Sequence, residues 1–181
     1  GTCTVDATVG LSQPYYSYRV DQVTHSSIDL KINNRIPALH MNHDYTGASR
    51  LSSFYLEPDY RCDFYDQLLS KSRLLFMACF PERFAATTIA EMKGVIDDEG
   101  ISPFWESVGR HFFTMDFAEA DLLTTSSHRH FIANLMPRYP LYVPLLSDKA
   151  QAVIGEHHEG VEDIVNILEH EGLHFEGHVD I

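Results

Sequence analysis

What the sequence lacks excludes several classes of protein. Its three cysteines, Cys3, Cys62 and Cys79, are widely spaced and odd in number, so they form no disulfide framework and favour a reducing cytoplasm. No run of eighteen apolar residues occurs, so we expect no membrane-spanning helix. Basic residues are scarce, 13 against 26 acidic ones, giving a net charge of −13. Such a surface repels phosphate backbones, which argues against sequence-independent nucleic-acid binding.

The remaining composition is that of a globular domain. Hydrophobic residues make up 44% of the 181 residues and charged residues 22%, close to the average for folded proteins. The length suits one domain covering residues 1–181. Strand-like alternation is already present at Thr2–Val9 and continues to the last residue in Leu173–Ile181. We therefore expect the chain to be a fragment of a longer protein.

Strand and helix patterns follow each other along the chain. Strands are predicted at Thr2–Val9, Tyr15–Thr24, Arg50–Leu56, Ala86–Ile96 and Leu173–Ile181. Helices are predicted at Asp66–Phe80, from Pro103 after Ser102, and at Val161–Leu168 with Gly172 as its end. The segment Ile36–Gly47, which contains Pro37, is interpreted as mixed. The pattern predicts the α/β (α+β) class.

One short motif points to zinc chemistry. His170-Glu171-Gly172-Leu173-His174 matches H-E-x-x-H, which on a helix would place two histidines on one face with a glutamate as general base. The helical period stops at Gly172, however, and apolar and polar residues alternate after it. We therefore favour a helix end followed by a strand, and keep a zinc hydrolase as an alternative.

A long and unusual motif supports a different function. Residues 102–117 read S-P-F-W-E-S-V-G-R-H-F-F-T-M-D-F, and Ala120-Asp121 follow. This stretch resembles the arginine N-succinyltransferase family, whose pattern is S-P-F-W-x-S-x-G-x-x-F-F-x-M-D-F-x-x-A-D. The resemblance is collinear over essentially the whole chain, including Leu69–Arg73, Ala90–Asp97 and Ala150–Gly155.

The resemblance implies a fold and a reaction. It implies a GNAT-like acyltransferase fold, a twisted mixed sheet with flanking helices, here without the family's N-terminal and C-terminal portions. It implies that the succinyl group of succinyl-CoA moves to the α-amine of arginine or a related cationic amino acid, in cytoplasmic arginine catabolism. No metal takes part in such a reaction, and we expect a homo- or hetero-oligomer.

The resemblance also implies site residues. The family's proton donor is the histidine of A-Q-x-V-I-G-x-x-H, which corresponds to His158, with His157 as the neighbouring alternative. Backbone amides of the strand at Leu51–Leu56 would hold the acyl group. Glu91 is a candidate for handling the amine proton or the guanidinium. Four cations are candidates for holding the succinyl carboxylate or CoA phosphates, namely Arg19, Lys71, Arg73 and Arg110. We assign donor binding to Phe54, Tyr55, Leu56, Arg61 and Lys71, and substrate binding to Glu91 and Arg19.

The match fails in one loop. The family's R-x-x-G-N-G is replaced here by Arg61-Cys62-Asp63-Phe64-Tyr65-Asp66, so both glycines are lost. Glycine lets backbone approach a phosphate closely, whereas Phe64 does not, and the carboxylates of Asp63 and Asp66 repel a pyrophosphate. The alternative to an active enzyme is therefore a catalytically impaired GNAT-like binding module.

Overall fold

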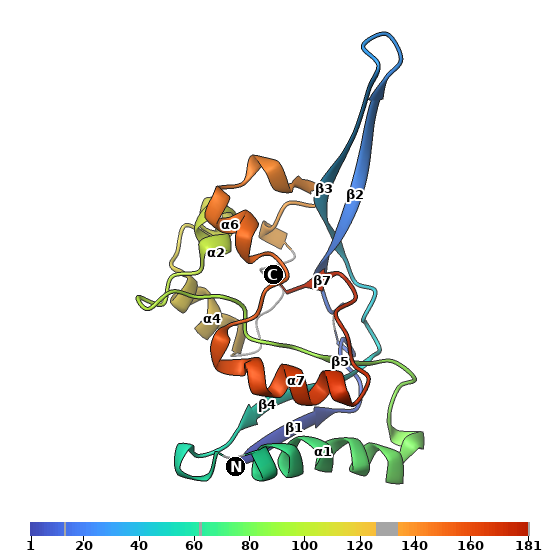
Figure 1. The fold of residues 1–181 in the computed structure, drawn as a ribbon, viewed down its shortest axis with the longest axis vertical. Coiled ribbons are helices and arrows are strands. Elements are labelled where there is room, and N and C mark those ends of the chain that lie inside the picture. Colours follow the sequence, from blue (N-terminus) through green and yellow to red (C-terminus); the bar gives the residue numbers. More distant parts are fainter. Residues whose placement is uncertain (13, 62, 126–133, 181) are drawn as a thin grey trace. The chain divides into compact units, whose positions relative to one another are not determined.

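The chain divides into two compact units (Figure 1). The computed structural model describes residues 1–12, 14–61, 63–125 and 134–180. Unit 1 consists of Gly1–Tyr15, His43–Lys93 and Glu159–Phe175. Unit 2 consists of Tyr16–Asn42, Gly94–His158 and Glu176–Ile181. In the described ranges, no helix is long and apolar enough to cross a bilayer.

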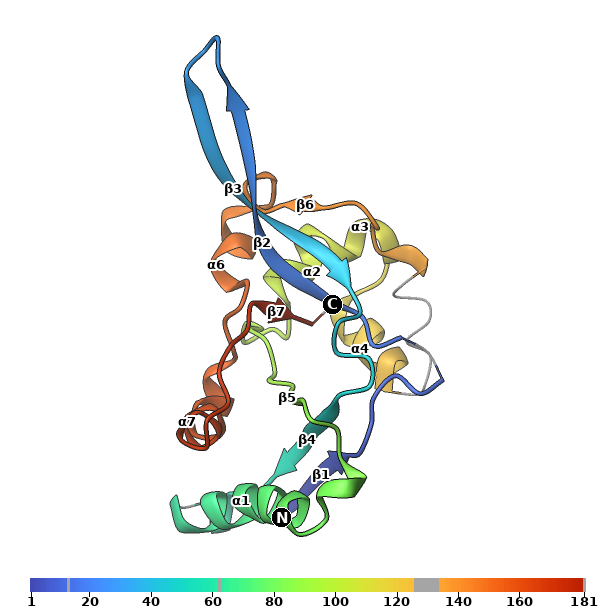
Figure 2. The same ribbon diagram turned by 90° about the vertical axis from the view of Figure 1, so that its right-hand side faces the viewer.

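Unit 1 is a three-stranded sheet with two helices. Strand β4 (Ser49–Tyr55) lies in the middle, antiparallel to β1 (Thr2–Asp6) and parallel to β5 (Thr88–Ala90). Helix α1 (Asp63–Cys79) packs on β1, and α7 (Glu162–His170) packs beside α1 (Figure 2). Single turns of 3₁₀ helix occur at Pro58–Tyr60, Pro81–Arg83 and Glu159–Val161.

Unit 2 is built around a long antiparallel hairpin. Its strands, β2 (Ser17–Ser27) and β3 (Ile32–Asn42), lie between β6 (Leu141–Tyr142) and β7 (His178–Val179) in the order β6-β3-β2-β7. The distal part of the hairpin extends beyond the rest of this unit (Figure 1). The helical elements of unit 2 are α2 (Pro103–Ser107), α3 (Gly109–Phe113), α4 (Phe117–Thr125), a 3₁₀ turn at Val143–Leu145 and α6 (Asp148–Val153).

The S-P-F-W motif contributes a buried tryptophan to the core of unit 2. The Ser102 side chain caps α2 by accepting a hydrogen bond from the Trp105 backbone N–H at 3.2 Å. The Trp105 indole stacks on Phe113 with ring centres 5.1 Å apart and donates its N–H to the Met115 carbonyl at 3.0 Å. The motif that carries the family resemblance therefore has a structural role here, because it fixes a buried tryptophan.

The mixed α/β class is confirmed, and so are most of the predicted elements. The predicted helix at Asp66–Phe80 is α1, which begins three residues earlier, and the predicted strand at Leu173–Ile181 is reduced to β7. The segment Ile36–Gly47 is mixed, as predicted, because β3 continues through Pro37 to Asn42 and a turn follows; the part of β3 that precedes it was not predicted. Proline is tolerated there because the neighbouring strand β6 pairs only with Ala38 and Leu39, which leaves the outer edge of β3 unpaired at Pro37 among the described strands.

Candidate acyl-donor site

Strand β4 carries a β-bulge at the residues predicted to contact the acyl donor. Thr2 and Thr4 of β1 pair with Tyr55 and Ser52, so Cys3 alone faces both Ser53 and Phe54. Ser53 has φ +51°, a left-handed conformation that a serine adopts at a steric cost. A bulge leaves its extra residue outside the hydrogen-bond ladder, and bulges are frequent beside active sites. The sequence identified this strand, but it gave no sign of the bulge.

Helix α1 places a buried cation beside the bulge. Arg73 is only 4% exposed, and its guanidinium lies 5.5 Å from the centre of the Phe54 ring. It donates to the Ser70 hydroxyl at 3.0 Å and, through Nε, to the Ser70 carbonyl at 3.4 Å. Burial lowers the pKa of Arg73, and its interaction with the nearby Cys3 opposes that shift.

Glu91 belongs to an ion-pair network within unit 1. Its carboxylate accepts hydrogen bonds from the Tyr15 hydroxyl and from Arg50 Nη1, the latter at 2.9 Å. Arg50 also binds Asp6, at 2.8 Å through Nε and 2.7 Å through Nη2. Burial alone would lower the pKa of Arg50, but the carboxylates of Glu91 and Asp6 outweigh it and raise the pKa. The sequence singled out Glu91 but missed its partners Tyr15 and Arg50, and also Asp6, the second carboxylate that binds Arg50, since these residues are brought together only by folding.

The expected phosphate loop is part of a helix. Residues 63–66 form the first turn of α1, which corrects the prediction of a loop that precedes the helix. Phe64 is 68% exposed, and its ring lies edge-on to Tyr65 at 5.5 Å. The Arg61 Nε donates to the Leu56 carbonyl at 3.2 Å, and the Tyr55 hydroxyl donates to Glu57 at 2.9 Å. These bonds fix the turn between β4 and α1.

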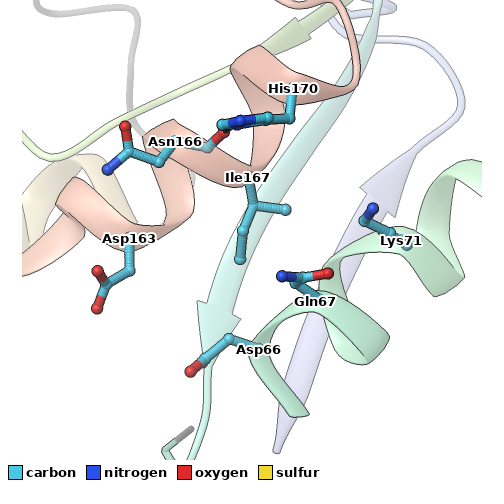
Figure 3. Close-up of a pocket in the computed structure, with 7 residues that line it drawn as sticks. All are labelled: Asp66, Gln67, Lys71, Asp163, Asn166, Ile167 and His170. Carbon is cyan, nitrogen blue, oxygen red and sulfur yellow. Dashed lines mark hydrogen bonds between the residues drawn. The ribbon is translucent and has the colours of Figure 1, made fainter. Parts of the chain in front are cut away.

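A pocket of about 270 Å³ lies between α1 and α7 (Figure 3). The residues that line it are Asp66, Gln67 and Lys71 from α1 and Asp163, Asn166, Ile167 and His170 from α7. Lys71 forms a 2.7 Å ion pair with Glu171. The two aspartates and two amides of this lining suit a small polar or cationic group better than a pyrophosphate.

The remaining predicted residues lie in unit 2. His158 is half-buried and directly follows His157, whose backbone forms an isolated antiparallel bridge with Gly94. Arg19 lies in β2 and forms an ion pair with Asp21 at 3.0 Å. The structure thus brings Phe54, Tyr55, Leu56, Arg61, Lys71 and Glu91 into unit 1, and Arg19 and His158 into unit 2.

The helical zinc motif is not formed. Helix α7 ends at His170, and Gly172 has φ +95°, so His174 lies outside the helix, as the periodicity predicted. His170 Nδ1 lies 2.6 Å from the Asn166 carbonyl instead. Among the residues that the structure describes, no three His, Cys, Asp or Glu side chains are arranged to hold a metal ion.

Comparison with known proteins decides the family. The family model described as "Arginine N-succinyltransferase beta subunit" matches residues 1–181. The chain belongs to this family. It is 45% identical over 181 residues to the arginine N-succinyltransferase of Citrobacter koseri, and 46% identical to that of Enterobacter sp. (strain 638). The resemblance predicted from the S-P-F-W motif is confirmed.

The chain spans about half the length of these relatives. It is covered completely in both alignments, but it covers 53% of either relative. A solved structure, the arginine/ornithine succinyltransferase subunit AI from Pseudomonas aeruginosa, matches with a TM-score of 0.88 and 41% identity. That match covers 98% of this chain and 51% of the other. The fold described above is therefore that of about half of a family protein.

Proposed function

We propose that the protein is a CoA-dependent N-acyltransferase that moves the succinyl group of succinyl-CoA to the α-amine of arginine. The reaction would serve arginine catabolism in the cytoplasm, without a metal and without nucleic acid as a partner. The observation that carries the proposal is the bulged strand β4 at Phe54 with the Arg73 cation beside it, in a chain of this family. Bulge amides suit a thioester carbonyl, and a cation suits an anionic acyl donor.

The protein must remove a proton from the amine, protonate the leaving thiolate, and stabilise the developing charge on the acyl oxygen. The amine nitrogen gives up a proton, for which Glu91 is the proposed acceptor, and attacks the thioester carbonyl carbon. A C–N bond forms, the C–S bond breaks, and the leaving thiolate takes up a proton. We assign that proton to His158, because imidazole titrates near neutrality. Backbone amides at Phe54, Tyr55 and Leu56 are proposed to bind the acyl oxygen while negative charge develops on it.

The charged candidates would exchange present partners for substrate. Arg19, Arg61 and Lys71 now bind Asp21, the Leu56 carbonyl and Glu171, respectively. Each is proposed to release that partner for a substrate or CoA oxyanion. Glu91 is proposed to bind the cationic acceptor with a carboxylate that its ion-pair network holds in place.

The test follows thiol release from succinyl-CoA. We expect release that depends on arginine, is unaffected by a chelator, and falls at least a hundredfold in His158→Ala. His157→Ala is the matched control and should keep most of the activity. Full activity in His158→Ala would refute the proton-donor assignment. Release that needs no arginine would refute the acceptor assignment.

The replaced glycines favour a second candidate function. Phe64 and Asp66 occupy the first turn of α1, where the family pattern has glycine, and Asp66 lines the pocket between the helices. On this alternative the chain is a binding module without catalysis. Titration of the folded protein with CoA in a calorimeter separates the two, because absence of CoA binding favours the module.

We also propose that the hairpin of unit 2 contacts a second copy of the chain. Beyond its pairing with β6 and β7, the β2–β3 ribbon is held by its own ladder and by a contact between the rings of His25 and Tyr142, 5.5 Å apart. Ile28 at its tip is 95% exposed. Residues 22–36 contain two basic residues and one acidic residue in a chain of net charge −13, so the ribbon complements the acidic surface of a second copy. Ile28→Ser combined with Leu30→Ser should convert a dimer to a monomer in light scattering. A wild-type monomer would refute this proposal.

A further inference from the structure

Arg73 is a buried cation without a carboxylate partner among the described residues. Within the described ranges, its hydrogen bonds go to the side-chain hydroxyl and the backbone carbonyl of Ser70. A guanidinium has five N–H donors, so these bonds leave most of its capacity unused. The other neighbours are the face of the Phe54 ring and the Cys3 sulfur. The sequence analysis named Arg73 as one of four cations that could bind the succinyl carboxylate or a CoA phosphate, and did not single it out.

Such a residue lowers the stability of the protein that contains it. Burying a charge is costly unless a counter-charge and hydrogen bonds compensate, and an apolar residue of similar volume is often more stabilising at such a position. Sites of this kind persist where function requires them, at the expense of stability. Arg110 shows the contrast, because its side chain is 42% exposed and binds the carboxylates of Glu106 and Asp116.

The position of Arg73 indicates which ligand completes it. The guanidinium lies against Phe54, one of two residues in the β4 bulge, and close to Cys3, which faces that bulge. Backbone groups at a bulge and an unpaired guanidinium together offer several N–H donors to one small volume. Carboxylate and phosphate oxygens are the groups that a guanidinium binds best.

We propose that Arg73 binds an oxyanion of the acyl donor at the β4 bulge. The identity of the donor rests on the proposed function. The oxyanion is either the terminal carboxylate of the succinyl group or a phosphate of CoA. Because the guanidinium of Arg73 lies over the Phe54 ring, Phe54 covers this subsite, and the anion binds the guanidinium N–H groups that Ser70 leaves unused.

The test compares Arg73→Met and Arg73→Lys with Arg83→Met. Arg83 is the matched control, because its guanidinium also lies over an aromatic ring, Phe80 at 5.0 Å, but its side chain is 63% exposed. Thermal unfolding is measured for each protein alone and with CoA, acetyl-CoA or succinyl-CoA. Dissociation constants are measured by calorimetry.

We expect opposite effects on stability and binding. Ligand-free Arg73→Met should unfold at a higher temperature than wild type and bind the donor at least tenfold more weakly, whereas Arg83→Met should match wild type in both. If only succinyl-CoA loses affinity, the anion is the succinyl carboxylate. If all three ligands lose affinity, it is a CoA phosphate. Arg73→Lys should recover part of the affinity, because it restores the charge without the bidentate geometry.

Two results would overturn the inference. One is an Arg73→Met protein with a lower unfolding temperature and unchanged affinities, which would make Arg73 a structural cation. The other applies if the wild-type protein binds no CoA compound. In that case the proposed function fails, and the oxyanion subsite is tested separately with succinate and with inorganic phosphate. Stabilisation by either anion that is lost in Arg73→Met would keep the oxyanion subsite, and no stabilisation by either would refute it.

Discussion

Replacing Gly109 by alanine should destabilise the protein, because the family motif leaves no room for a side chain there. A Cβ atom on Gly109 would lie 2.3 Å from Cε3 and 2.5 Å from Cδ2 of Trp105. The indole has little freedom to move, since the residue is 5% exposed, its ring stacks on Phe113, and its N–H is bonded to the Met115 carbonyl. The clash must therefore be relieved by displacement of the core of unit 2.

The expected magnitude follows from the two opposing effects. Overpacking of a filled core typically destabilises a protein by about 1–3 kcal/mol. Because this contact is so short, we expect a cost near the upper end, about 3 kcal/mol. Alanine also has less backbone entropy than glycine in the unfolded chain, which stabilises the folded protein by about 0.5–1 kcal/mol. The net loss is about 2 kcal/mol, which lowers the unfolding temperature by roughly 4–8 °C for a chain of this size.

A second glycine provides the control. Gly94 has no atom within 4 Å of an added Cβ, so Gly94→Ala meets no clash and should gain only the entropic contribution, raising the free energy of unfolding by about 0.5–1 kcal/mol. Both variants are compared by calorimetry and by urea unfolding. Equal stability of the two variants would refute the reasoning, because it would mean that the tryptophan moves aside at no cost.

Three further predictions concern polar groups. The Tyr18 hydroxyl is buried without a hydrogen-bond partner in the described part of the chain, and burial raises its pKa. Above pH 10 the unfolded chain releases this proton while the folded protein keeps it, so stability should fall as the pH rises; Tyr18→Phe should remove that contribution and add about 1 kcal/mol in urea unfolding at pH 7. Arg50→Met leaves the partly buried carboxylates of Asp6 and Glu91 facing each other and should cost about 2 kcal/mol, less than the loss from a fully buried pair, with only partial recovery in Arg50→Lys; an unchanged urea midpoint would contradict this. Asp66→Gly restores a family glycine and should tighten CoA binding about threefold or more in calorimetry, and weaker binding would count against the predicted repulsion.

Local patterns predicted much of the fold. The apolar spacing of α7 and the position of Gly172 predicted both the helix end and the failure of the zinc motif, because a left-handed glycine and a lost period are local signals. Ser102 and Pro103 likewise predicted the start of α2. Strand β3 was predicted only in part, because the effect of Pro37 depends on whether a neighbouring strand needs its N–H.

The site was less predictable than the fold. The sequence singled out Phe54 and Glu91 through the resemblance, but the bulge at Ser53 depends on the register between β1 and β4. Arg50 is an ordinary strand residue until folding brings it to Asp6 and Glu91. Pairing register and long-range ion pairs are decided by tertiary packing, which local sequence patterns do not predict.

The division into units has a consequence for dissecting the protein genetically. The backbone passes from one unit to the other after residues 15, 42, 93, 158 and 175. No truncation at either end and no excision of one stretch yields either unit intact, so an expression plasmid for half of this fold would need several spliced segments. A single protease cut between β2 and β5 would likewise produce two fragments that each hold pieces of both sheets, and neither fragment should refold alone.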